Sequence, residues 1–429
     1  MRTGLTTLLI VLSLHSISRA QTLAHSAIQP SPTLHLPLPT GSIHYVLTFS
    51  SLLETGSAIQ DAPSYLTNIS GDLSYQSQST KHPFNILYAG GWGTSTDPYL
   101  PPTVFQNLTL MQGLIAGKWS MNASNSFSYL PYAPTAGLSG IPGIGDLGFQ
   151  TGEPAAAHTP TVLTNYATII SDSLSGNITR QLDYDTYLTG STTWGQERFL
   201  SGAGLTTNEL IGSVGLNRRL NARSSIAATY AYSNYTYSSS GFSFTTQGAN
   251  ILGRHQWTRA LSTTASIGPQ WIRSSNATAV PQRLALAASA SVTYSRRATF
   301  AEVTYTRGSV SGFGVLPGAF STSIQTELQQ ALTRKWMASL SGTFITVAGL
   351  GVTNGTPTNV DSTGAGTAGY ASMQVTHTLG RSFTAYLSYT FESQSVDQPL
   401  QARNALNGMS QIIATGISFR PHSKDLGGS

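Results

Sequence analysis

Apolar and small polar residues alternate along this chain in segments of about ten residues, each followed by a turn. The clearest segment places these residues at one parity: Leu284, Leu286, Ala288, Ala290, Val292 and Tyr294. Because successive side chains of a strand point to opposite faces, this pattern predicts strands with one apolar and one polar face. A soluble sandwich would bury the apolar face, whereas a barrel in lipid turns it outward and lines its lumen with the polar face.

From about residue 205 the segments come in pairs, and short turns alternate with long connections. The short turns fall at 217–221, 255–259, 296–297, 334–335 and 380–381. The longer connections fall at 235–241, 274–283, 308–318, 348–366 and 393–408. Short turns at one end and long loops at the other are typical of outer-membrane barrels.

The same unit continues upstream. The expected pairs are 67–77 with 84–92, 104–112 with 117–127, and 173–183 with 184–194, and single strands are expected at 43–53 and 411–419. These segments bring the count to 18, or to 16 if one upstream pair is loop. We therefore predict an all-β fold, a transmembrane antiparallel up-and-down β-barrel of 16–18 strands over residues 41–420.

The N-terminus predicts export. Arg2 precedes an apolar run over 5–14, and Ser18 and Ala20 before Gln21 give the small-x-small shape of a cleavage site. The run is too short for a membrane-spanning helix. We expect a signal peptide at 1–20, an N-terminal extension at 21–40 and a C-terminal tail at 421–429.

Composition narrows the class. The chain has no cysteine, and charged residues make up 9%, against roughly 25% in soluble domains. The formal charge of +5 is not concentrated in a Lys/Arg run, so we expect no nucleic-acid partner. The nine histidines are scattered, so we expect no metal site and no cofactor. The composition also fits an extracellular adhesin or another structural β-protein.

The six tryptophans fall at the ends of the expected strands. Those beside short turns are Trp119, Trp257 and Trp336, and those beside long loops are Trp92, Trp194 and Trp271. This distribution predicts two interfacial aromatic girdles, whereas a sandwich core would place most tryptophans in mid-strand.

The last strand carries the most specific resemblance. Ile413, Thr415, Ile417 and Phe419 share one face, and the strand resembles the closing strand of an outer-membrane β-barrel of the porin-like kind. That resemblance implies a bacterial outer-membrane location and an assembly machinery that recognises Phe419 as the terminal aromatic. The residues after Phe419 depart from the pattern.

Parity places several charges on polar faces, where a water-filled lumen can hold them. These candidate lumen-lining residues are Asp72, Lys118, Asp183, Asp185, Glu302, Glu327 and Glu392. Asp183 and Asp185 could form a carboxylate pair for acid–base chemistry, but their place beside a turn favours a solvated rim. Arginines also gather near the short turns, either as ordinary turn residues or as a basic rim that favours anions.

Residues 128–172 form a connection too long for an ordinary barrel loop. Its apolar residues predict burial, either in the lumen as a constriction or plug, or in an external cap. The candidate constriction residues are Tyr129, Tyr132, Leu138, Ile141, Ile144 and Asp146.

These features together predict a non-enzymatic, porin-like channel for small hydrophilic solutes in the outer-membrane bilayer. A polysaccharide-export barrel is the alternative within this class. A surface adhesin and a barrel hydrolase are the alternatives from other classes.

Overall fold

The computed structural model describes residues 41–56, 63–96, 103–130, 168–200, 206–238, 242–275, 282–313, 316–350, 365–397, 407–421 and 424–426. Its strands are β1 (Gly41–Thr55), β2 (Ser64–Ser77), β3 (Phe84–Ser95), β4 (Thr103–Ala116), β5 (Trp119–Leu130), β6 (Ile169–Gln181), β7 (Thr186–Phe199), β8 (Thr207–Arg219), β9 (Ser224–Tyr237), β10 (Phe242–Gln256), β11 (Leu261–Ser274), β12 (Arg283–Arg296), β13 (Thr299–Phe313), β14 (Leu316–Ala331), β15 (Trp336–Gly349), β16 (Ala365–Leu379), β17 (Phe383–Val396), β18 (Gly408–Phe419) and β19 (Lys424–Leu426). Within these ranges, no helix is long and apolar enough to cross a membrane.

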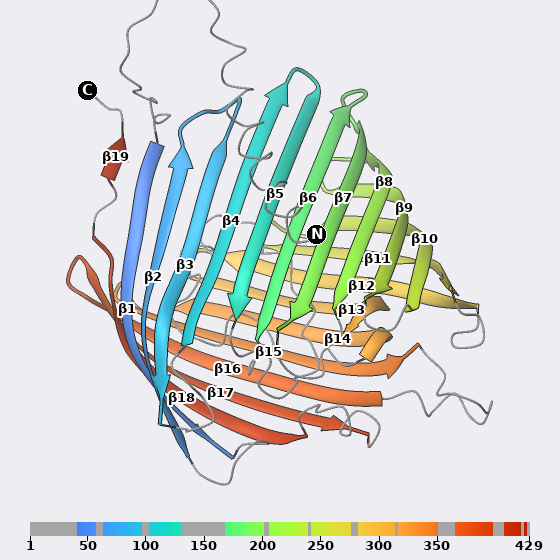
Figure 1. Cartoon of the computed structure of the whole chain (residues 1–429). Helices are drawn as coiled ribbons and strands as arrows, with labels where there is room; N and C mark the ends of the chain where they lie inside the picture. The colour runs from blue at the N-terminus through green and yellow to red at the C-terminus, as the bar shows by residue number, and fades with distance from the viewer. Residues whose placement is uncertain are drawn as a thin grey trace, which may run out of the picture. The chain divides into compact units, whose positions relative to one another are not determined.

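Strands β1 to β18 form one closed antiparallel barrel (Figure 1). Each strand pairs with its neighbours in the chain, and the barrel closes where β18 runs beside β1. There Leu47 lies opposite Phe419, and Thr55 lies opposite Gln411. Closure satisfies the backbone groups that an open sheet would leave at its edges. The predicted fold class is confirmed, with 18 strands in the barrel.

The short β19 adds to this barrel from the predicted C-terminal tail. Its residues Lys424 and Leu426 lie opposite Ile43 and Gly41 at the start of β1. Since β18 reaches β1 only from Leu47 onward, β19 covers part of the β1 edge that β18 leaves open.

Short turns gather at one end of the barrel, which we call the turn end, and the opposite end is the loop end. The β4–β5 turn contains only Gly117 and Lys118, and Gly117 adopts a φ of 59°. The β12–β13 turn is equally short, and Arg297 adopts a φ of 41° there. Two-residue hairpin turns require such left-handed residues because their twist must match that of the strands. β1 begins and β18 ends at this same end.

Several strands at the loop end are longer than the sequence pattern predicts. The connection expected at 308–318 is largely strand, because β13 runs to Phe313 and β14 starts at Leu316. The connection expected at 235–241 begins as strand, because β9 runs to Tyr237. Likewise β5 reaches Leu130 and β6 starts at Ile169, so both ends of the expected 128–172 loop are strand. Alternation marks only the part of a strand that faces lipid, whereas backbone pairing continues beyond it.

One close backbone approach interrupts the β10–β11 ladder. Between the pairs Gly248 with Gln270 and Ile251 with Ile267, two residues of each strand lack a ladder partner. One of them is Pro269, which has no N–H to donate. A Cβ on the adjacent Gly268 would overlap the carbonyl oxygen of Ala249, so this approach requires glycine.

Candidate functional site: the lumen

The outer face of the barrel is an apolar belt. On β12, Leu284 is 64% exposed, Leu286 is 52% exposed and Val292 is 46% exposed. On the closing strand, Ile413 and Ile417 are about equally open at 47% and 50%. A soluble protein rarely exposes so continuous an apolar surface. Lipid is the solvent that matches this belt.

The inner face is lined by hydroxyl groups that bond across neighbouring strands. Ser266 and Ser289 join β11 to β12 with a 2.7 Å distance between their Oγ atoms. Equivalent pairs, with separations of 2.6 Å, join Ser191 to Ser213, Ser124 to Ser175 and Thr306 to Ser323. An apolar outer face around a polar inner face is the reverse of a soluble barrel.

The chain is a transmembrane β-barrel of the outer-membrane type. The predicted two faces of β12 are therefore confirmed, with the apolar parity outside. The outward parity of the last strand also holds, since Phe419 shares the face of Ile417 and lies 5.1 Å from Phe383 between ring centroids.

The barrel places its tryptophans near the two ends of the apolar belt. Those toward the turn end are Trp119, Trp257 and Trp336, and those toward the loop end are Trp92, Trp194 and Trp271. All but Trp194 are exposed outward, and Trp194 lies level with the outward Leu174 and Leu210. Interfacial anchoring by these rings stays a proposal.

Polar contacts appear on the outer face beyond these rings. Two residues past Trp194, the Gln196 amide donates to Asn208 at 2.7 Å. At the turn end, the Arg180 guanidinium lies 5.0 Å from the centre of the Trp119 ring. Such polar and cationic groups beside tryptophan are typical of the headgroup region.

Four of the predicted lumen carboxylates lie on the inner face. They are Asp72 on β2, Glu302 on β13, Glu327 on β14 and Glu392 on β17. Glu302 and Glu327 lie directly opposite each other in register. Thr304 donates to Glu302 at 3.1 Å, and Gln329 donates to Glu327 at 2.7 Å. Like charges opposite each other repel, and those two donors offset part of the repulsion.

The other three predicted lumen residues lie in turns and not on a strand of the barrel wall. Lys118 belongs to the β4–β5 turn, and its Nζ donates to the carbonyl of Leu182. Asp183 and Asp185 lie in the β6–β7 turn, because β7 begins only at Thr186. Parity counting fails there, since a turn residue has no fixed face.

The Asp183–Asp185 pair is a capped turn on the solvated rim. The backbone N–H of Asp185 donates to Asp183 Oδ1 at 2.9 Å. Hydrogen bonds from this N–H and from Thr186 hold the pKa of the Asp183 carboxyl below its usual value. A base for acid–base catalysis at neutral pH needs a raised pKa, so Asp183 lacks that character.

Three further carboxylates face the lumen and were missed by the sequence reasoning. They are Glu54 on β1, Glu197 on β7 and Glu209 on β8. Glu209 lies opposite Gly195, two residues from Glu197, and Ser410 donates to Glu54 at 2.8 Å. The outward Trp194 and Leu210 carry the missed signal, since Glu197 and Glu209 lie an odd number of positions from them and must therefore face inward.

An aromatic cluster covers part of the inner wall near the loop end. Tyr235 stacks on Phe244 with ring centroids 4.6 Å apart, and Tyr237 lies 6.2 Å from the same ring. Phe244 and Ile272 are each 1% exposed. Such complete burial inside a water-filled barrel means that another part of the chain covers these side chains.

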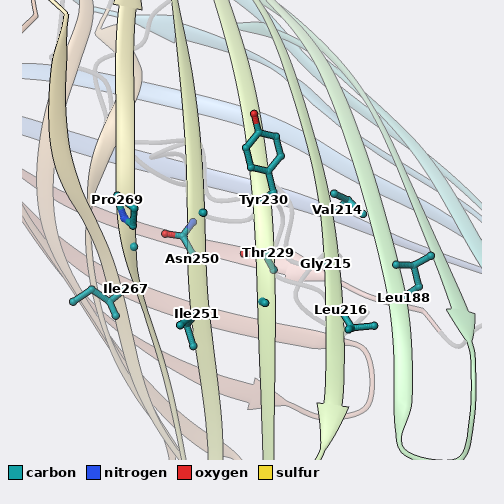
Figure 2. A pocket seen from close by; sticks show the side chains of 13 residues that line it. Leu188, Val214, Gly215, Leu216, Thr229, Tyr230, Asn250, Ile251, Ile267 and Pro269 are labelled. Atoms are coloured by element: carbon teal, nitrogen blue, oxygen red, sulfur yellow. The ribbon is translucent and has the colours of Figure 1, made fainter.

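A shallow hollow on the outer face is not a solute site. Figure 2 shows its lining side chains across β7 to β11. Large residues such as Leu188, Ile251 and Ile267 surround small ones such as Gly215 and Ala249. Its lining belongs to the apolar belt, so a lipid acyl chain is the natural occupant.

Among the described residues, no group of three or more His, Asp or Glu could hold a metal ion.

The candidate constriction residues Tyr132, Leu138, Ile141, Ile144 and Asp146 lie outside the described ranges. Tyr129 is part of β5 and shares the outward parity of Met121. Tyr129 therefore does not point into the lumen.

Comparisons with known proteins identify no family. No family model and no curated protein matches the chain. Among solved structures, Pseudomonas aeruginosa OpdQ matches with a TM-score of 0.42 and 9% identity, covering 90% of this chain and 99% of that one. P. aeruginosa OccK2 (OpdF) in complex with glucuronate gives 0.44 and 9%, covering 90% and 98%. The ferric citrate transporter FecA gives 0.43 and 13%, covering 92% and 66%. At these values the matches assign no family or solute.

Proposed function

We propose that this protein is a passive, non-enzymatic channel for small hydrophilic solutes in the bacterial outer membrane. The observation that carries the proposal is the reversed polarity of the closed barrel. Apolar side chains such as Leu284 face outward, and hydroxyl pairs such as Ser266–Ser289 face inward. A wall with this polarity separates lipid from water, and barrels of 16–18 strands enclose an aqueous lumen.

The size of the barrel supports passage of solutes. With a strand spacing of about 4.8 Å and a tilt of about 40°, 18 strands place the backbone roughly 18 Å from the axis. Inward side chains of about 5 Å leave a free radius of roughly 13 Å where nothing else enters. This width exceeds that of a hydrated monosaccharide or amino acid.

The rival classes fit this polarity less well. An adhesin or a soluble structural β-protein would pack its apolar faces internally, whereas residues such as Phe49 and Ile251 are 56% and 61% exposed. A barrel hydrolase requires an acid–base pair, and the Asp183–Asp185 turn does not provide one. A polysaccharide-export barrel shares the same wall and differs only in its solute.

The proposal also assigns roles in export and in membrane assembly to the two ends of the chain. Residues 1–20 direct export, and the outward Phe419 at the end of β18 is the signal for the outer-membrane assembly machinery. The support is positional, because Phe419 contributes no polar group to the lumen and lies beside the strand pair that closes the barrel. The 131–167 part of the long connection lies outside the described residues, and its entry into the lumen stays a prediction.

Reconstitution into planar bilayers tests the proposal. The detergent-purified full-length protein should produce discrete conductance steps in symmetric KCl. The control is the same sample heated until its heat-modifiable band is lost, which should be silent. Folded protein that gives no steps in repeated insertions would contradict the channel function, and release of the protein by carbonate washing would contradict the membrane location.

A further inference from the structure

The β13–β14 hairpin leaves the barrel wall at the loop end. The last ladder pair between β12 and β13 is Ala288 with Arg307, so residues 283–287 of β12 have no β13 partner within the described residues. β13 nevertheless continues to Phe313 and stays paired with β14, where Phe313 lies opposite Leu316. β13 therefore departs from β12 while it keeps its ladder with β14, and β14 itself stays paired with the wall strand β15 only as far as Ala319.

Hydrogen bonds hold this hairpin against the inner face of β9 and β11. The amide of Gln270 contacts Ser309 twice: its Nε2 donates to Ser309 Oγ at 2.6 Å, and its Oε1 accepts from the Ser309 N–H at 3.1 Å. The Tyr237 hydroxyl donates to the backbone carbonyl of Ser311. Gln270 and Tyr237 both face the lumen, because their neighbours Trp271 and Thr236 have the outward parity. The hairpin therefore lies on the lumen side of the wall.

Apolar contacts seal the same surface. Gly318 of β14 adopts a φ of 69°, and a Cβ there would lie 2.6 Å from the Phe244 ring. Its carbonyl accepts from the Leu350 N–H at 3.1 Å, and the adjacent Ala319 is completely buried. Gly318 therefore allows the chain to turn closely over Phe244. This packing accounts for the burial of the aromatic cluster.

Two arginines hold the base of the hairpin. The guanidiniums of Arg283 and Arg307 lie 5.9 Å and 5.4 Å from the centre of the Phe320 ring. Arg283 belongs to the part of β12 that β13 has left, and Arg307 marks the point of departure. The two cation–π contacts thus bridge the break in the ladder.

From these contacts we infer that residues 308–313 and 316–318, the inner hairpin, form a fixed constriction of the lumen near its loop end. The inference rests on the proposed channel function. A two-stranded hairpin with its side chains has a cross-section of roughly 100 Å². The open lumen estimated above has roughly 500 Å². The inner hairpin thus removes about a fifth of the conducting area.

The first test releases the inner hairpin while keeping the barrel. Tyr237→Phe with Gln270→Ala removes all three anchoring hydrogen bonds and retains the ring that packs on Phe244. The full-length variant should show single-channel conductance roughly a fifth to a quarter above wild type, by the area argument, with greater current noise from the loosened segment. The heat-modifiable band on gels should stay at the wild-type level, which shows that the barrel still folds.

The second test locks the hairpin. The chain has no cysteine, so Gln270→Cys with Ser309→Cys, made together with Tyr237→Phe, introduces the only thiols into a released hairpin. A short, reducible bis-methanethiosulfonate reagent should bridge them, as detected by mass spectrometry, and should give a quiet current of wild-type size. Reductant should then restore the higher and noisier current. The control pair is Ser266→Cys with Ser289→Cys in the wall, where bridging should leave the current unchanged.

The outcomes separate this inference from the channel proposal. Wild-type conductance together with an unchanged current in the released variant would overturn the constriction alone. Failure of the 270–309 pair to cross-link, when the 266–289 pair does, would also overturn it. Silence of every folded protein, wild type included, would overturn the channel and the constriction with it.

Discussion

Arginine at two neighbouring positions of β12 would separate the lipid face from the lumen face. Ala290 faces outward beside Ala265 and Tyr305, whereas Ser289 faces inward and bonds Ser266 at 2.7 Å. Ala290→Arg therefore places a guanidinium in lipid, and Ser289→Arg places it in lumen water. The two substitutions lie at nearly the same depth, so depth is controlled within the pair.

The expected magnitude follows from that depth. Ala290 is six residues from Arg296 at the turn end, which amounts to about 15 Å along the barrel axis for a strand tilted by about 40°. This is close to the middle of an apolar band about 25 Å tall, where an outward arginine costs about 2–4 kcal/mol. Ser289→Arg should cost about 1 kcal/mol, the value of one lost hydrogen bond.

Folding into lipid vesicles across a urea series measures both costs. Ala290→Arg should lower the folding equilibrium constant roughly 30- to 1,000-fold, since every 1.4 kcal/mol is tenfold, while Ser289→Arg should change it less than about tenfold. Heat-modifiable migration reports the folded fraction. Equal effects at the two positions, or a larger effect at Ser289, would mean that the belt does not face lipid, and the channel proposal would lose its basis.

Three further outcomes are expected. Phe419→Ala should reduce the amount of folded, heat-modifiable protein in the outer membrane by more than Phe383→Ala does; equal reductions would show that the ring pair matters rather than the terminal position. Gly268→Ala should destabilise folding by about 1–3 kcal/mol because a backbone oxygen occupies the space of its Cβ. Gly253→Ala, with no atom within 4 Å of that space, should be near neutral, and equal urea midpoints would contradict this reasoning. The folded pKa of Asp183 is lowered, so its stabilising contribution is complete above the unfolded pKa and disappears as the pH falls through the folded pKa. Asp183→Asn should therefore lower the urea midpoint at neutral pH and not at pH values below both pKa values, whereas a pH-independent effect would refute a role for the charge.

The sequence by itself determined the wall of the barrel. Alternation in segments such as 284–294 sets two faces, because a strand has period two, and the scarcity of charge then favours lipid as the partner of the apolar face. Short turns alternating with long loops predicted the up-and-down order. Parity also places Glu302 and Glu392 on the inner face, because each lies within a regular strand whose outward residues are large and apolar.

Turns and strand ends were harder to predict, because a residue there has no fixed face. Lys118 and Asp183 were assigned to the wall by counting parity through a turn. The strand number was bounded at 16–18 and became 18 only through the backbone pairing that joins β18 to β1. That pairing links residues more than 350 positions apart, such as Leu47 and Phe419, and local alternation carries no information about it.

The inner hairpin was decided by tertiary structure alone. Residues 308–318 read as a long loop, and their glycine-rich composition does not distinguish an external loop from a strand pair inside a lumen. What places them inside is contact with side chains far away in the sequence: Gln270 bonds Ser309 across 39 positions, and Tyr237 bonds Ser311 across 74. A lumen offers water and polar groups on all sides, so a hairpin there needs no alternation of its own, and only its fixed partners on β9 to β11 determine where it lies.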